Sequence, residues 1–214
     1  MIFMKSLGNV FILGDSYSTF EGVIPENFAA YYSAAEQLGG LKTAEETWWM
    51  HVINETNSHL LKNCSYSGTT VCNITYEGKY CPDTSFVGRI ADWLDTGEYK
   101  PSDIDTIFVF GGTNDSWAES PIGKPKYSGR TDEDLKSFSP ALCELFEILK
   151  KTCPKARIIN ITNTDLKEEI SSVMSEICAH YSIQNIVLTK IDKDNGHPTV
   201  LGMKNIADEI LAAL

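Results

Sequence analysis

A serine follows the first apolar run of the chain in a setting that suits a nucleophile. Residues 9–13 read as a buried strand and lead into GDSYS at 14–18, which contains Ser16. The glycine before it permits a tight turn, which would expose the serine at the rim of a sheet. A Gly-Asp-Ser triplet alone is more often an ordinary turn or a helix cap, so Ser16 predicts catalysis only with a partner.

A histidine near the carboxyl terminus can be that partner. Residues 194–198 read DNGHP, with Asp194 three positions before His197 on a glycine-containing turn. An aspartate so placed can accept from one ring nitrogen while the other faces a nucleophile, which is the base-and-orienter arrangement of serine hydrolases. The other three histidines lack such an acid and are expected to be structural or exposed: His51, His59 and His180.

Two further segments place hydrogen-bond donors after predicted strands. GGTND at 111–115 contains Asn114, and NCSYSG at 63–68 ends in Gly68, whose backbone can approach a ligand closely. Alone, each segment would be interpreted as an ordinary turn. Because both follow strands of the same predicted sheet as Ser16, we expect them to donate to an oxyanion. The neighbouring acids Asp15 and Asp115 are expected to stabilise their turns.

The elements that must position these residues alternate along the chain. Strand-like runs fall at 9–13, 60–63, 106–110, 157–161 and 185–188, and helices are expected at 45–57, 86–94, 132–152, 166–180 and 200–214. This alternation predicts an α/β fold in which a parallel sheet is covered by helices on both faces. Long irregular stretches at 18–25, 65–84 and 116–131 come directly after strands, where open α/β sheets form their sites.

Four motifs together give the chain a family resemblance. It resembles the SGNH (GDSL-type) hydrolases, whose Ser, Gly, Asn and His are matched in order by Ser16, Gly68, Asn114 and His197. The resemblance implies a three-layer α/β/α flavodoxin-like fold with a five-stranded parallel sheet. It also implies a Ser16–His197–Asp194 triad, and an oxyanion hole made by the backbone N–H groups of Ser16 and Gly68 and the Asn114 side chain. No cofactor and no metal is required.

Aromatic residues are the candidates for substrate contact. Trp117 follows the Asn114 motif directly, and Trp48-Trp49 and Tyr31-Tyr32 are further candidates for walls that stack on sugar rings. Tyr17 stands where many members of the family carry a small residue or Leu, which bears on substrate choice. Core packing is at least as good an explanation for Trp48-Trp49 and Tyr31-Tyr32, but not for Trp117.

The expected reaction is hydrolysis of short acyl esters, acetyl above all, of a carbohydrate or other small molecule through an acyl-enzyme on Ser16. A lysophospholipase or thioesterase is the alternative, and it would need an apolar acyl groove that the sequence does not reveal. An inactive relative that only binds a glycan is a third hypothesis, which the presence of all the signature residues disfavours.

Composition limits the other partners. The 214 residues, with 43% hydrophobic content and a formal net charge of −11, predict a single domain over residues 1–214 and disfavour nucleic acid and anionic membranes as partners. The six cysteines form no CxxC pair, so we expect free thiols and no zinc site. The amino terminus lacks a signal-peptide pattern, which predicts a cytoplasmic protein unless a leader was removed.

Overall fold

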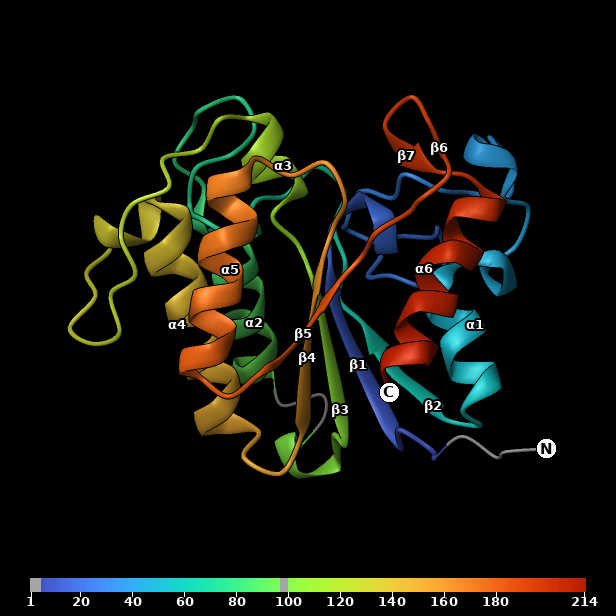
Figure 1. Cartoon of the computed structure of the whole chain (residues 1–214), viewed down its shortest axis with the longest axis horizontal. Helices are drawn as coiled ribbons and strands as arrows, with labels where there is room; N and C mark the ends of the chain where they lie inside the picture. Colours follow the sequence, from blue (N-terminus) through green and yellow to red (C-terminus); the bar gives the residue numbers. More distant parts are fainter. Residues whose placement is uncertain (1–4, 97–99) are drawn as a thin grey trace.

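The computed structural model describes residues 5–96 and 100–214. Five parallel strands form its central sheet in the order β2-β1-β3-β4-β5 (Figure 1). The strands are β1 (Asn9–Gly14), β2 (His59–Asn63), β3 (Thr106–Phe110), β4 (Arg157–Thr162) and β5 (Gln184–Val187). The apolar runs of the sequence match these strands to within one residue at either end.

Side chains of β1 alternate between two hydrophobic clusters, one on each face of the sheet. Val10 and Ile12 belong to one cluster, and Phe11 and Leu13 belong to the other. All four are fully buried. Because both faces are covered, the strand is continuously apolar from Val10 to Leu13, which is typical of a central parallel strand. Burial on both faces therefore fixes β1, and with it the residues that follow its carboxyl end.

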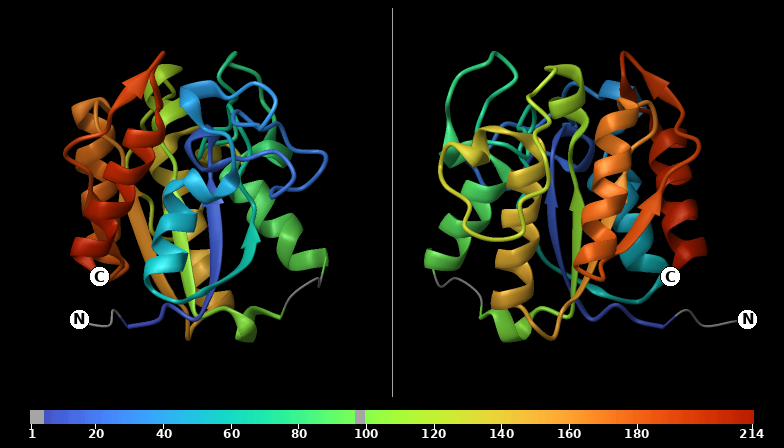
Figure 2. Two further views of the ribbon diagram at one scale, coloured as in Figure 1. Left: turned by 90° about the vertical axis from the view of Figure 1, so that its right-hand side faces the viewer. Right: turned by 60° about the vertical axis from the view of Figure 1, so that its left-hand side comes forward.

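Helices cover both faces and complete three layers (Figures 1 and 2). One face carries α2 (Phe86–Thr96), α4 (Phe138–Thr152) and α5 (Glu168–His180). The other carries α1 (Trp48–Glu55) and α6 (Val200–Ala213), which pack against each other. The predicted three-layer α/β/α fold with its five-stranded parallel sheet is thereby confirmed.

Two helices begin three or more residues later than the sequence predicts. The helix expected from residue 132 starts at Phe138, because Asp134 accepts hydrogen bonds from the Thr131 backbone N–H and hydroxyl and holds a separate 3-10 turn. The helix expected from residue 45 starts at Trp48, where Thr47 is the N-cap and its hydroxyl accepts from the Met50 N–H. Side-chain oxygens that bond local backbone compete with helix formation in this way.

Two elements at the carboxyl ends of the strands were not predicted. The short helix α3 (Thr113–Trp117) follows β3, and a hairpin of β6 (Lys193–Asp194) and β7 (His197–Pro198) precedes α6. Both lie above the sheet in Figure 1, together with the loops that follow β1 and β2. The candidate catalytic residues therefore lie at the edge of the sheet where the strands end, as parallel topology requires.

All six cysteines carry free thiols, as expected. Burial raises the pKa of the Cys72 thiol to about 12 and that of the Cys153 thiol to about 11. Because the thiolate is the nucleophilic form, these two groups are unreactive near neutral pH.

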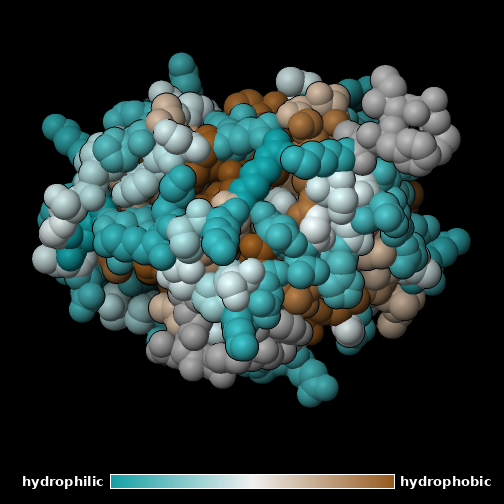
Figure 3. Space-filling view, turned by 90° about the horizontal axis from the view of Figure 1, so that it is seen from below, coloured by the Kyte–Doolittle hydropathy of each residue, from teal (hydrophilic) through white to brown (hydrophobic). Residues whose placement is uncertain are grey.

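The surface at the amino ends of the strands is mostly hydrophilic. Viewed from that side, apolar residues occupy small separate areas between polar ones (Figure 3). Within residues 5–96 and 100–214, no helix combines the length and the apolar character that crossing a bilayer demands.

Candidate active site

Ser16 lies on a tight turn at the carboxyl end of β1. The turn is a single 3-10 helix, Ser16–Ser18, and the Asp15 carboxylate caps it by accepting from the Tyr17 backbone N–H at 3.0 Å. Gly14 leaves no space for a side chain, because a Cβ there would lie 2.5 Å from the Ser18 hydroxyl oxygen. This local packing explains the glycine and the acid of the GDSYS motif, and it leaves Ser16 facing a pocket.

His197 reaches Ser16 from the opposite end of the chain. It begins β7 of a hairpin whose two-residue turn, Asn195-Gly196, has φ of 47° and 79°. This is the Asn-Gly turn that favours the twist of a two-stranded hairpin. The Nε2 atom of His197 lies 3.0 Å from Ser16 Oγ, so the predicted nucleophile and base are within hydrogen-bond distance of each other.

Aromatic rings hold the histidine in place. The Tyr31 ring stacks on the imidazole with centroids 3.6 Å apart and planes 8° apart. The Trp117 ring meets it edge-on at 5.6 Å. Contact with these rings restricts rotation of the imidazole and leaves its Nε2 directed at Ser16.

Two buried tyrosines anchor the backbone of the same hairpin. The Tyr17 hydroxyl donates to the Gly196 carbonyl, and the Tyr32 hydroxyl donates to the Pro198 carbonyl at 2.7 Å. Because Tyr17 directly follows Ser16, one residue ties the nucleophile turn to the histidine hairpin.

Asp194 does not occupy the place that the sequence predicts for it. The Nδ1 atom of His197 lies 3.2 Å from the Asn195 backbone carbonyl, and the exposed Asp194 carboxylate makes no hydrogen bond to the ring. Asp194 and His197 are paired only as opposite residues of the hairpin. A carbonyl at Nδ1 favours the tautomer with its proton there, which leaves Nε2 as the acceptor for the serine proton. The physical reason for the difference is the tight turn, which brings a backbone oxygen to the ring.

The environment of His197 favours its neutral form. Burial lowers its pKa, the Lys193 charge lowers it further, and the bond to the Asn195 carbonyl acts in the opposite direction. A neutral imidazole is the form that can accept a proton from a serine.

The expected oxyanion donors line the same pocket as Ser16 and His197. Gly68 has φ of +78°, a conformation that favours glycine, and Asn114 lies in the first turn of α3. One N–H of the Asn114 amide donates to the Thr69 carbonyl at 2.9 Å, which fixes the side chain and leaves its second N–H for a ligand. The pocket has a volume of about 310 Å³.

Of the three residues predicted to contact substrate, the structure places one at the pocket and two in the core. Trp117 is 40% exposed and lines the pocket. Trp48 and Tyr17 do not: both are fully buried, and the Trp48 indole N–H donates to the Ser18 hydroxyl at 3.2 Å. Their large apolar surfaces serve the core on the α1 and α6 side of the sheet. Tyr31 and Tyr76 line the pocket instead.

Arg89 of α2 is a positioning residue that sequence reasoning missed. It is 2% exposed, and its guanidinium donates to the Gly14 carbonyl at 3.1 Å, the Thr69 hydroxyl at 3.0 Å, and the Cys64 carbonyl. A signal was available: Arg89 falls three residues after Phe86 and four before Trp93, so it lies on the apolar face of a helix.

Asp115 holds the loop that carries Gly68. Its carboxylate accepts from the backbone N–H groups of Val71 at 2.8 Å and Cys72 at 3.2 Å. Burial raises its pKa to about 6, and that of Asp15 to about 7, against the effect of these backbone bonds. Both acids bind backbone beside the site, in agreement with the turn-stabilising interpretation.

The comparisons with known proteins decide the family. A family model described as GDSL-like lipase/acylhydrolase matches residues 8–214. The chain belongs to this family. A solved structure from Bacteroides uniformis, described as a GDSL-like lipase, is 45% identical with a TM-score of 0.87, and the match covers 97% of this chain and 95% of that one. Another with the same description, from Bacteroides ovatus, is 39% identical with a TM-score of 0.90 and covers 98% of each chain.

More distant structures share the fold of this GDSL-like acylhydrolase. An acetyl xylan esterase from the rumen bacterium Butyrivibrio proteoclasticus is 18% identical with a TM-score of 0.64, and covers 98% of this chain and 64% of that one. No curated protein matches the chain. The family establishes the protein as an ester hydrolase of the GDSL-like acylhydrolase type.

Replacing Asp194 tests how the histidine of this acylhydrolase is oriented. We expect Asp194→Asn to keep kcat/KM for p-nitrophenyl acetate within about threefold of the parent, a loss under about 1 kcal/mol, because the carboxylate does not bond the ring. His197→Ala is the control and should lose nearly all activity. A loss of about 10²-fold or more in a folded Asp194→Asn enzyme would restore Asp194 to the triad.

The pH dependence tests the state of His197. We expect kcat/KM on a neutral ester to fall on acidification with a midpoint below about 6.5, the ordinary histidine pKa, because a lowered pKa keeps the imidazole neutral to more acidic pH. Lys193→Met removes a nearby positive charge and should raise that midpoint. A rate that stays flat from about pH 8 to pH 4 would contradict the role of His197 as base.

Proposed function

We propose that the protein is a serine esterase that removes short acyl groups, acetyl above all, from a carbohydrate or other small molecule. The observation that carries the proposal is the 3.0 Å contact between His197 Nε2 and Ser16 Oγ, in a pocket that Gly68 and Asn114 also line. A nucleophile, its base and donors for an oxyanion are the groups that acyl transfer requires.

The reaction proceeds in two steps. His197 Nε2 accepts the Ser16 hydroxyl proton as Oγ attacks the ester carbonyl, and the resulting oxyanion is bound by the N–H groups of Ser16 and Gly68 and by the Asn114 amide. His197 then gives the proton to the leaving alcohol, which forms the acyl-enzyme. In the second step a water molecule gives a proton to His197 and attacks the acyl carbonyl, and Ser16 leaves with that proton.

The lining of the pocket supports a short acyl group. Its volume of about 310 Å³ is at the small end of the range for ligand sites. Among the residues that the structure describes, no Leu, Ile, Val or Met lines it. A long acyl chain would find no aliphatic groove there, which disfavours the lysophospholipase or thioesterase alternative.

Aromatic rings at the mouth of the pocket support a sugar as the alcohol. Tyr76 is 51% exposed and Trp117 is 40% exposed, and both line the pocket with Tyr31. Exposed aromatic faces next to polar groups suit the apolar faces of sugar rings. Structures with the same fold include an acetyl xylan esterase and family two carbohydrate esterases, which supports the proposal by analogy of fold.

A panel of esters tests the proposal. We expect kcat/KM on p-nitrophenyl esters to fall at least about tenfold from acetyl or butyryl to decanoyl, because the pocket lacks an apolar groove. Acetylated sugars should release acetate, and Ser16→Ala should release none. Faster hydrolysis of the decanoyl ester would favour the lipase-like alternative, and binding of acetylated glycans without any hydrolysis would favour the inactive relative.

A further inference from the structure

A hairpin from the loop after β2 brings a carboxylate to the catalytic pocket. Ile74 and Tyr80 pair as an antiparallel bridge, the Thr75 N–H donates to the Lys79 carbonyl at 2.8 Å, and Gly78 at the turn has φ of +77°. Tyr76 and Glu77 lie at the tip of this hairpin, and both line the pocket with Ser16 and Asn114. Glu77 is therefore placed where it can contact the alcohol part of an ester whose acyl carbonyl lies at Ser16.

Glu77 is the only Asp, Glu, Lys or Arg that lines the pocket within residues 5–96 and 100–214. Its pKa is lowered by hydrogen bonds from its own backbone N–H and from the Thr75 hydroxyl, so it is ionised near neutral pH. The nearby cations do not line the pocket. Lys79 follows on the same hairpin, and Lys193 is paired with Asp165 at 3.2 Å.

A second hollow beside the catalytic pocket is also lined by carboxylates. It has a volume of about 550 Å³, and Tyr31 lines both the catalytic pocket and this hollow. Glu21, Glu26 and Glu36 line it, and within the described chain no Lys or Arg does. A substrate that extends from Ser16 past Tyr31 therefore meets carboxylates and no compensating cation.

We propose that Glu77 is a specificity-determining residue that makes the pocket reject esters with an anionic alcohol part and favour those with hydroxyl-rich or cationic ones. The inference rests on the proposed esterase function and narrows its substrate class. An anionic group beside Glu77 is repelled, a cation is attracted, and sugar hydroxyls donate hydrogen bonds to the carboxylate. Neutral sugars and amino sugars fit this pocket, whereas uronic acids and phosphate-bearing lipids do not.

Three acetate esters of similar size test the assignment: acetylcholine, its neutral analogue 3,3-dimethylbutyl acetate, and the anion 3-acetoxypropanesulfonate. For each enzyme, kcat/KM is expressed relative to the neutral ester, so that a general change of activity cancels. We expect the parent to prefer the cation to the anion. In Glu77→Gln that cation-to-anion ratio should fall at least about fivefold, the size of one charge pair a few ångströms apart in water. Glu77→Lys should invert the preference.

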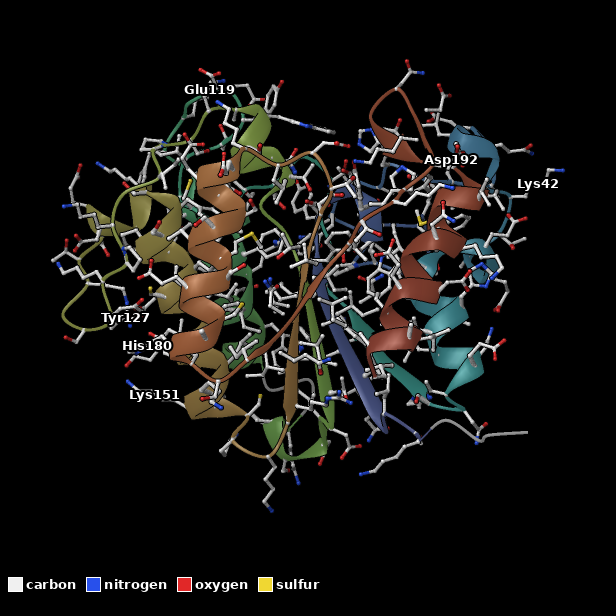
Figure 4. The ribbon with its side chains drawn as sticks, in the orientation of Figure 1. Lys42, Glu119, Tyr127, Lys151, His180 and Asp192 are labelled. Atoms are coloured by element: carbon white, nitrogen blue, oxygen red, sulfur yellow. The ribbon has the colours of Figure 1, made fainter. Side chains whose placement is uncertain are left out.

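The matched control is Glu119→Gln. Glu119 lies near α3 at the top of Figure 4, is paired with Lys167 at 2.9 Å, and does not line the pocket. The Glu119→Gln substitution changes the net charge by the same amount as Glu77→Gln, and it should leave the cation-to-anion ratio of kcat/KM unchanged. The parent ratio should also shrink as salt rises from about 0.01 M to 1 M, because screening weakens exposed charges.

The possible failures can be told apart. An unchanged ratio in Glu77→Gln, or an equal fall in Glu119→Gln, would overturn the role of Glu77 while leaving the esterase intact. If the folded parent hydrolyses none of the three esters and no acetylated sugar, the proposed function fails, and this inference fails with it.

Discussion

A buried guanidinium is the constraint on which the active site depends. Arg89 joins the carboxyl ends of β1 and β2 through the carbonyls of Gly14 and Cys64, and its bond to the Thr69 hydroxyl holds the loop that follows β2. Thr69 in turn accepts from the Asn114 amide through its carbonyl. The segments that carry the three expected oxyanion donors are thus linked through Arg89 and Thr69. Burial lowers the pKa of Arg89 to about 10, so it stays charged, and a buried charge is stable only while these hydrogen bonds are made.

The histidine side of the site is built by aromatic residues. Tyr17 and Tyr32 bond the hairpin backbone at Gly196 and Pro198, while Tyr31 stacks on the imidazole. The loop after β1 therefore supplies both the proposed nucleophile, Ser16, and the residues that support its proposed base, His197. This coupling explains how His197, 181 residues away in sequence, lies 3.0 Å from Ser16. It also explains why Tyr17 and Tyr32 serve architecture and not substrate contact.

The sheet was predictable because its central strands β1, β3 and β4 are buried on both faces and are therefore apolar runs in the sequence, and the strand ends determine where Ser16, Gly68 and Asn114 lie. The hydrogen-bond partner of His197 Nδ1 could not be predicted, because the choice between the Asp194 carboxylate and the Asn195 carbonyl depends on the hairpin turn. The Asn195-Gly196 pair was a signal for that hairpin. Trp117 was favoured as a pocket residue because it directly follows the Asn114 motif, whereas only packing shows that Trp48 is buried in the core. Arg89 was missed although its place on the apolar face of a helix was a signal, because that place does not by itself show what a buried cation would bind.

Covalent labelling tests the central claim, that Ser16 is the nucleophile and His197 its base. The parent enzyme is treated with a fluorophosphonate probe near neutral pH, and the adduct is located by mass spectrometry. Only a serine paired with a base attacks such a phosphorus centre readily, so the account predicts an adduct on Ser16 alone, formed far more slowly in a folded His197→Ala variant. An adduct on another serine, no adduct on a preparation that hydrolyses esters, or labelling of Ser16 that is unaffected by loss of His197 would contradict it.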